Sequence, residues 1–380
     1  MAAVYLDYNA TAPIRPEAAA AIAHALAIGG NPSSVHAAGR TARAVVEKAR
    51  GEVAALVSVV PGSVTFTSGG TESNALAIDS AIAAGARRPI VCMTEHASVM
   101  EGALAAGHIV EGWPVHSDGT ADLEWLAARL KDWNTADGRP FVALSLANNE
   151  TGVIQPVAEV ARLVREANGW LHVDAVQAVG KIAVDFNALG ADTLSISGHK
   201  LGGPQGVGAL VSGPRITVSR RIHGGGQERG RRAGTENVPG IAGLGAAASA
   251  AMRDLEAFEG QADVRDGAQQ LLAEAADIVV FGEGAPRLPN VLCFASTGFD
   301  AQQQVMALDL DGVMVSAGAA CSSGKVSASK VLIAMGHEAL AGCAIRVSGG
   351  WATTLEDWDR FVSVWLSAHA RHRARRSAAA

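Results

Sequence analysis

Residues 194–200 of the chain read Leu194-Ser195-Ile196-Ser197-Gly198-His199-Lys200. This is the pattern of an apolar strand that breaks at a glycine and ends on a lysine, and a glycine-rich run over 201–208 follows it. Partial desolvation of a lysine at a strand end lowers its pKa and frees the amine to attack a carbonyl. Taken alone, the stretch fits a surface lysine in a turn better. The sequence upstream favours the reactive lysine.

A second short apolar strand upstream reads Leu171-His172-Val173-Asp174-Ala175, with Gln177 three positions beyond the acid. Pyridoxal phosphate (PLP) needs a lysine for its aldehyde and a carboxylate that keeps its ring nitrogen protonated. Parallel strands that end at one edge of a sheet bring such groups to one crevice, where ligands of open α/β sheets bind. The pair Asp174 and Lys200 therefore predicts a PLP site.

A phosphate site is indicated where Ser68-Gly69-Gly70-Thr71-Glu72-Ser73-Asn74 follows a strand over 63–67 and opens a helix to about residue 84. Small residues at a helix start leave backbone N–H groups free for an anion. A capping turn without a ligand fits this stretch equally well. The basic, glycine-rich loop over 223–235 suits a phosphate better than nucleic acid, because no aromatic residue separates its arginines. A flexible solvated loop is the alternative.

The composition is that of a globular chain large enough for two domains: 380 residues, 49% hydrophobic and 18% charged. A net charge of −6 argues against a nucleic-acid binder. No long apolar run predicts a membrane span, and the N-terminus does not read as a signal peptide. No cysteine pair is spaced as CxxC, so neither a zinc site nor a disulfide framework is indicated, and we expect a cytoplasmic protein with reduced thiols.

Strands and helical patterns alternate, which predicts an α/β fold with a mostly parallel sheet covered by helices. The predicted strands of this large domain span 63–67, 89–94, 141–146, 171–175, 194–198 and 207–212. The predicted helices include 16–28, 34–56 and 238–255. A smaller α+β domain is expected to hold a helix near 261–275, strands at 278–281, 291–294 and 313–317, and a frayed basic tail at 369–376.

Taken together, these stretches resemble the NifS/IscS-type cysteine desulfurases, in the class V aminotransferase group of fold-type I PLP-dependent transferases. The resemblance extends over nearly the whole chain. Its matching stretches are 5–11, 67–74, 94–96, 148–150, 172–177, 197–200, 223–235 and 318–321. We predict a large PLP-binding domain over 15–256, and a small domain, formed by 1–14 and 257–380, that carries a catalytic cysteine loop.

The resemblance implies a role in cofactor binding for most matching positions. Lys200 is expected to hold PLP, Asp174 to pair with its ring nitrogen and Gln177 to bind its phenolic oxygen. His96 is expected to stack on the ring and act as an acid and base, with Asn149 beside ring and substrate. The expected phosphate ligands are Gly70, Thr71, Ser197, His199 and, from the other subunit of a homodimer, Thr235.

Two further positions concern the substrate, L-cysteine. Arg346 is expected to clamp its carboxylate, as a bidentate guanidinium does well. Cys321, in the small-residue loop 318–324, is expected to be the exposed nucleophile, and a buried structural thiol is the alternative. We interpret Cys92 and Cys293 as buried structural residues, and the sequence leaves Cys343 undecided.

The resemblance implies a PLP-dependent cysteine desulfurase that releases L-alanine and leaves the sulfur as a persulfide on Cys321. The sulfur is expected to pass to an iron–sulfur scaffold or another acceptor protein, for cluster assembly or other thiolation. The alternatives are a selenocysteine lyase, a class V aminotransferase and a sulfur-relay scaffold. Residues 322–330 lack the Leu-Glu-Pro-Ser run of the housekeeping subgroup, and the tail is shorter, which bears on the acceptor. No resident metal is expected, only a transient iron–sulfur contact at Cys321.

Overall fold

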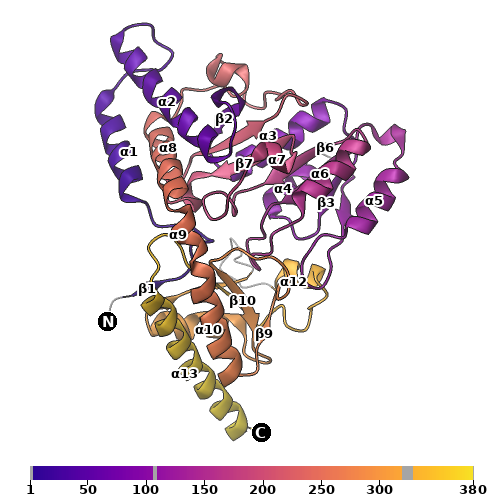
Figure 1. The fold of residues 1–380 in the computed structure, drawn as a ribbon, viewed down its shortest axis with the longest axis vertical. Helices are drawn as coiled ribbons and strands as arrows, with labels where there is room; N and C mark the ends of the chain where they lie inside the picture. The colour runs from indigo at the N-terminus through magenta and orange to yellow at the C-terminus, as the bar shows by residue number, and fades with distance from the viewer. Residues whose placement is uncertain (1–2, 106–108, 319–327, 380) are drawn as a thin grey trace.

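Two sheets with their covering helices lie one above the other along the long axis of the molecule (Figure 1). This computed structural model describes residues 3–105, 109–318 and 328–379. Three successive helices, α8 (Val238–Arg253), α9 (Leu255–Glu259) and α10 (Gln261–Ala275), run from the larger sheet to the smaller one. Across the described ranges, none of the helices has both the length and the apolar character needed to cross a bilayer.

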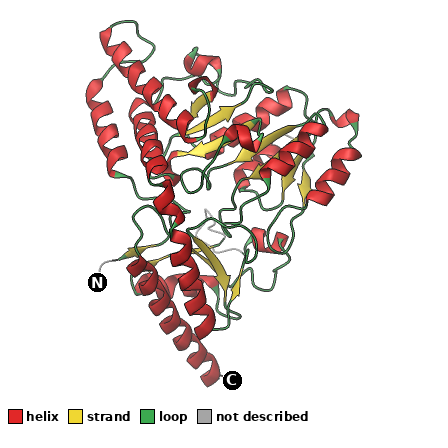
Figure 2. Cartoon of the chain, viewed as in Figure 1, coloured by secondary structure: helices red, strands yellow, loops and turns green. Residues whose placement is uncertain are grey.

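The larger sheet has seven strands, and four of its six neighbouring pairs are parallel. In spatial order the strands are β2 (Val64–Thr67), β8 (Gly208–Ser212), β7 (Thr193–Ser197), β6 (Trp170–Asp174), β5 (Phe141–Ser145), β3 (Pro89–Cys92) and β4 (Glu111–Trp113). Strand β8 is antiparallel to both of its neighbours. Apart from Ser145 at the end of β5, the inner strands are buried along their whole length, because helices cover both faces of the sheet (Figure 2). The predicted mostly parallel sheet is thereby confirmed.

Helices α1 (Pro16–Ile28) and α2 (Ala37–Leu56) pack against α8. Helix α2 begins three residues later than predicted, because the His36 side chain caps it by accepting a hydrogen bond from the Gly39 N–H at 3.4 Å. The other helices of this unit are α3 (Gly70–Ala83), α4 (Ala97–Ala105), α5 (Leu123–Lys131), α6 (Val157–Glu166) and α7 (Phe186–Leu189). Single 3-10 turns are η1 (Pro61–Ser63), η2 (Thr135–Asp137), η3 (Gly198–Lys200) and η4 (Gln227–Gly230).

The smaller sheet is antiparallel and has the order β12 (Ser316–Ala317), β13 (Ala344–Ser348), β10 (Val291–Ala295) and β9 (Val279–Val280). A separate parallel pair joins β1 (Val4–Tyr5) to β11 (Val313–Met314). The single strand predicted over 313–317 is therefore wrong, because its two halves belong to different sheets. The remaining helices are α11 (Ala301–Leu310), α12 (Lys330–Ala334) and α13 (Leu355–Ala379).

The basic tail does not fray as the sequence led us to expect, since α13 continues to Ala379. His369 is buried and its Nε2 lies 3.1 Å from the Ser296 hydroxyl. His372 stacks on Phe299 with ring centroids 4.3 Å apart. The two histidines give the basic stretch an aromatic face that docks on the smaller sheet's unit.

The first residues of the chain connect the two sheets. Strand β1 lies in the smaller unit, and Asp7 forms a bridge to Ser348 of β13. The backbone then reaches the larger unit, where the Ala12 N–H donates to the His199 carbonyl at 2.8 Å. Residues 7–12 therefore pass between the ends of the larger sheet's strands and β13.

Candidate active site

Polar side chains collect where the parallel strands of the larger sheet end. Asp174 is the last residue of β6, and it lies opposite Ser195 in the neighbouring parallel strand β7. Lys200 ends the 3-10 turn that follows β7. Both residues are therefore at the carboxyl edge of the sheet, where open α/β sheets bind ligands.

The Asp174 carboxylate is buried and hydrogen-bonded on both oxygens. It accepts a hydrogen bond from the Asn74 amide at 2.8 Å and one from the Val176 N–H at 2.9 Å. The Asn74 oxygen lies 3.0 Å from the His172 Nε2. Burial lowers the pKa of His172 to about 4, so the ring is neutral, and it donates from Nε2 to the Asn74 oxygen. This orients the amide so that its N–H groups face Asp174.

His96 is exposed and connects to the same asparagine through Ser98. Its Nδ1 accepts a hydrogen bond from the Ser98 N–H at 3.1 Å and lies 2.8 Å from the Ser98 hydroxyl. That hydroxyl in turn accepts from the Asn74 amide at 2.9 Å. A backbone N–H can only donate, so a neutral His96 carries its proton on Nε2.

The Lys200 amine points to the N-terminal segment, where it donates to the carbonyls of Asn9 at 2.5 Å and Ala10 at 2.8 Å. Burial and the charge of Arg346 lower the pKa of Lys200 to about 8, against the opposing charges of Asp7 and Asp174. A substantial neutral fraction near physiological pH makes this amine a nucleophile for an aldehyde.

Small residues surround the start of α3. Gly69 precedes the helix with φ +153° and provides no side-chain cap, and the Ser197 hydroxyl lies 3.9 Å from where a Gly69 Cβ would be. A Cβ on Gly70 would come within 2.8 Å of the Val176 side chain. These features leave helical N–H groups facing a space that an anion such as a phosphate suits. The neighbouring Thr71 is exposed.

The two remaining expected phosphate ligands are His199 and Thr235. The Nδ1 of His199 is 3.2 Å from the Thr11 hydroxyl, and burial together with Lys200 lowers the pKa of His199 to about 4. Thr235 is exposed and lines a small cavity of about 70 Å³ with Thr67 and Ser68 of its own chain. Within one chain, Thr235 therefore lies near the residues that precede α3, and His199 contacts the N-terminal segment.

Arg346 approaches the site from β13 of the smaller sheet and is buried. Its Nη2 donates to the Asp7 carboxylate at 2.6 Å, and its Nη1 donates to the Asn149 carbonyl at 3.1 Å. Its Nε is buried and has no hydrogen-bond partner among the described residues. The guanidinium already holds one carboxylate and retains a free donor, as expected of a carboxylate site.

Asn9, Asn74 and Lys181 are the site residues that sequence reasoning missed. Asn9 bonds through its backbone carbonyl to both Gln177 and Lys200, at 3.0 and 2.5 Å. Asn9 and Asn74 lie in stretches that carried the family resemblance, which was the available signal. However, Gln177 and Lys200 lie more than 100 positions from Asn9, and Asp174 lies 100 positions from Asn74.

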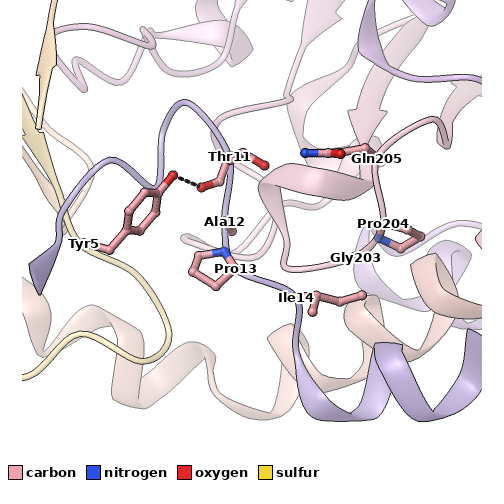
Figure 3. Close-up of a pocket in the computed structure, with 8 residues that line it drawn as sticks. All are labelled: Tyr5, Thr11, Ala12, Pro13, Ile14, Gly203, Pro204 and Gln205. Atoms are coloured by element: carbon pink, nitrogen blue, oxygen red, sulfur yellow. Dashed lines mark hydrogen bonds between the residues drawn. The ribbon is translucent and has the colours of Figure 1, made fainter. Parts of the chain in front are cut away.

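A cavity of about 510 Å³ adjoins this constellation (Figure 3). Its lining residues are Tyr5, Thr11, Ala12, Pro13, Ile14, Gly203, Pro204 and Gln205. The Tyr5 hydroxyl donates to the Thr11 carbonyl at 2.8 Å, the contact dashed in Figure 3. Burial and the charge of Asp7 raise the pKa of Tyr5 to about 12, so it remains a donor. The cavity borders Thr11, a neighbour of His199, but excludes Lys200 and Asp174.

Cys321 lies outside the described residues. On its N-terminal side, Ser316 of β12 pairs with Arg346, and on its C-terminal side the Ser329 hydroxyl donates to the Glu150 carboxylate at 2.6 Å. Cys92 and Cys293 are buried, as interpreted from the sequence, and burial raises the pKa of both thiols. Cys343, which the sequence left undecided, is partly exposed.

Residues 4–361 match the family model described as aminotransferase class-V. The chain belongs to the class-V aminotransferase family. Within this family it is similar to a cysteine desulfurase of Cereibacter sphaeroides, 42% identical over 377 residues that cover 96% of this chain and 95% of that protein. It is also 38% identical to the cysteine desulfurase IscS of Dictyoglomus turgidum over 364 residues, 93% of this chain and 91% of that protein.

Among solved structures, the class-V fold of this chain is similar to a NifS-like protein from Rickettsia africae, with a TM-score of 0.88 and 31% identity. That match covers 97% of this chain and 99% of the other. The predicted family and the predicted fold-type I architecture are thereby confirmed. Membership of the class-V family implies PLP as the cofactor.

Proposed function

We propose that this class-V aminotransferase family member is a PLP-dependent cysteine desulfurase, which converts L-cysteine to L-alanine. The observation that carries the proposal is the position of Lys200, whose pKa is about 8, between the buried Asp174 and the carboxylate-holding Arg346. An amino acid has an amine and a carboxylate to bind in this way. The choice of cysteine rests on the relatives named cysteine desulfurase.

The residues present fit PLP. The buried Asp174 carboxylate suits a protonated ring nitrogen, Gln177 offers an amide N–H beside Lys200, and the start of α3 offers N–H groups to a phosphate. We assign the phosphate to Gly70, Thr71, Ser197, His199 and the partner subunit's Thr235. Once bound, PLP supplies a ring that accepts electrons from the substrate Cα.

The chain's own groups then bind the substrate and move protons. Arg346 binds the substrate carboxylate in place of Asp7. The Lys200 amine takes the proton from Cα and returns it. His96 Nε2 donates a proton or accepts one near the substrate thiol, and Asn149 lines the substrate position between them.

The sulfur step takes place at Cys321. The thiolate of Cys321 attacks the substrate sulfur, an S–S bond forms, and the Cβ–S bond breaks. L-cysteine and the Cys321 thiol together give L-alanine and a Cys321 persulfide, so all atoms are accounted for. The transferred sulfur is oxidised as Cβ is reduced, and the reaction therefore needs no external oxidant.

The proposal includes an arrangement beyond the single chain. We assign a large domain to 15–256 and a small one to 1–14 with 257–380. The active unit is a homodimer, and the persulfide sulfur passes in the cytoplasm to an iron–sulfur scaffold or another acceptor. The basic 223–235 loop supports the dimer, because its exposed Thr235 is available to a neighbour.

The test is to incubate the protein with L-cysteine and locate one added sulfur by mass spectrometry. We expect the sulfur on Cys321, and we expect Cys321→Ser to bind PLP normally but make alanine more slowly by about 10³-fold. Cys343→Ser, at the partly exposed thiol among the described residues, is the matched control and should retain activity. Alanine formed by Cys321→Ser at the wild-type rate would refute the proposal, and would favour a selenocysteine lyase, which needs no nucleophilic cysteine.

A further inference from the structure

Lys181 is a buried lysine behind the active site, with 4% of its surface exposed. Its Nζ donates to the Asn9 side-chain oxygen at 2.6 Å and to the Gln177 side-chain oxygen at 2.8 Å. Both partners are uncharged amides. Burial and the charges of Lys200 and Arg346 lower the pKa of Lys181 well below its ordinary value. An amine in so unfavourable a position calls for a local reason.

The two hydrogen bonds fix which way two amides face. An amide side chain can present its oxygen or its NH₂ group, and a lysine amine that donates two hydrogen bonds can donate them only to the oxygen ends. With its oxygen on Lys181, Asn9 directs its NH₂ group to the Asn149 carbonyl at 3.1 Å. Gln177 likewise directs its NH₂ group to the Asn9 carbonyl at 3.0 Å.

Both oriented amides lead to the proposed reaction site. The Asn9 carbonyl accepts a hydrogen bond from the Gln177 amide and another from the Lys200 amine at 2.5 Å, so the two donors converge on one oxygen. The Asn149 carbonyl likewise accepts a hydrogen bond from the Asn9 amide and another from Arg346 Nη1, the latter at 3.1 Å. Lys181 is thus connected to Lys200 through Asn9 alone, and to Arg346 through Asn9 and then Asn149.

We propose that Lys181 is a positioning residue of the active site, which holds the Gln177 NH₂ group beside Lys200 and keeps Asn9 and Asn149 aligned with Arg346. The proposal rests on the proposed function for its cofactor. The phenolic oxygen of PLP neighbours the aldehyde that a lysine attacks, so a donor beside Lys200 suits that oxygen. A flipped Gln177 would turn its oxygen toward the Asn9 carbonyl, and two acceptors repel each other.

The experiment compares Lys181→Met with wild type, each purified with PLP. We expect a PLP dissociation constant raised about 3- to 10-fold, as the loss of one hydrogen bond predicts. We also expect a shifted absorption maximum of the bound cofactor and a raised KM for L-cysteine. Gln177→Leu should reproduce the raised PLP dissociation constant and the shifted absorption maximum. The double variant should add no further loss of PLP affinity, because both changes remove one interaction.

Arg265→Met is the matched control for the loss of a buried cation, since Arg265 is 6% exposed and holds the Leu288 carbonyl at 2.7 Å in the smaller unit. It should lower the melting temperature and leave PLP affinity and absorption unchanged. If Lys181→Met fails to fold, Lys181→Gln replaces it, because its shorter amide cannot reach both partners. A Lys181 variant with lower stability but wild-type PLP affinity and absorption would overturn the proposal.

PLP affinity and absorption are measured without turnover, so they separate this inference from the proposed function. A wild-type protein that binds PLP but forms no alanine from cysteine refutes the desulfurase activity alone. A Lys181→Met protein with unchanged PLP affinity refutes the positioning role alone.

Discussion

Two halves of the candidate site differ in how they are held together. The cofactor half consists of Asn74, Asp174 and Lys200, and the substrate half of Asp7, Asn149 and Arg346. In the cofactor half, Asn74 and Asp174 bond to each other within the seven-stranded sheet and the helix that covers it. In the substrate half, Arg346 lies near the end of the chain, and it bonds to Asp7 near the beginning and to Asn149 near the middle.

The difference indicates which contacts depend on how the two units approach each other. Packing within one unit fixes the Asp174 carboxylate, because its donors come from α3 and the turn after β6. The guanidinium of Arg346 meets its carboxylate and carbonyl partners only when β13, the N-terminal segment and the loop after β5 come together. Substitutions in the two halves should therefore affect different measurements.

The largest effect is expected from Lys200→Ala in the cofactor half. Loss of the amine removes the covalent attachment and the base together, so alanine formation should fall by more than about 10³-fold. The variant should also lose the adduct that borohydride traps. Lys131→Ala on α5 is the control and should behave as wild type. A trapped adduct on a different lysine would contradict the assignment.

Arg346→Met should give the next largest effect, in the substrate half. Removing one partner from a buried charge pair costs about 2–5 kcal/mol, so kcat/KM for L-cysteine should fall by roughly 30- to 5,000-fold. The absorption of bound PLP should remain that of wild type. The kcat/KM of Arg346→Lys should lie between that of wild type and that of Arg346→Met, since a lysine keeps the charge but cannot form the bidentate contact. A large change in PLP affinity would show that the halves are not separable.

Asn74→Leu should have a moderate effect that is confined to the cofactor half. Asp174 and His172 each lose a partner, and a buried group left unpaired costs about 1–3 kcal/mol. We expect a lower melting temperature and weaker PLP binding, with KM for L-cysteine changed less than PLP affinity. Asn187→Leu on the exposed face of α7 provides the control. An unchanged PLP affinity in Asn74→Leu would contradict the orienting role of Asn74.

The smallest effect, and one that depends on pH, is expected from Glu95→Gln. Burial and the charge of Asp174 raise the pKa of Glu95 to about 8, so the folded protein keeps a proton there that the unfolded chain releases above about pH 4.5. Wild type should therefore lose stability relative to Glu95→Gln as the pH rises from 5 to 8. Melting temperatures across this range measure the difference, with exposed Glu101→Gln as control. A difference in melting temperature between wild type and Glu95→Gln that stays constant from pH 5 to 8 would contradict the raised pKa of Glu95.

The larger sheet and, within the cofactor half, the positions of Asp174 and Lys200 could be predicted because their signals are local. Buried strands are continuous apolar runs, and polar residues directly after them fall at the sheet edge, as Asp174 and Lys200 do. The strand predicted over 313–317 was wrong, since an apolar run does not reveal that it changes sheets at Val315. The tail was misjudged because the partner of His372, Phe299, is remote in sequence.

The network behind the substrate half could not be predicted. Lys181 reaches Asn9 over 172 positions and Arg346 reaches Asp7 over 339, and nothing in either stretch indicates its partner. The family resemblance pointed to Arg346 and includes Asp7 in its stretch 5–11, but it supplied no reason to pair these two residues or to consider Lys181. Such partners meet only when the tertiary structure forms, and local sequence patterns do not encode which remote residues will meet.

The pairing of the chain's beginning with its end has a consequence for biosynthesis. Asp7 and Arg346 are 339 positions apart, which at 5–20 residues per second corresponds to roughly 20 to 70 s of translation. Asn74 and Asp174, only 100 positions apart, are both available far earlier. The N-terminal strand β1 must wait unpaired until β11 emerges from the ribosome. The growing chain thus has its cofactor-binding residues long before it can recognise an amino acid.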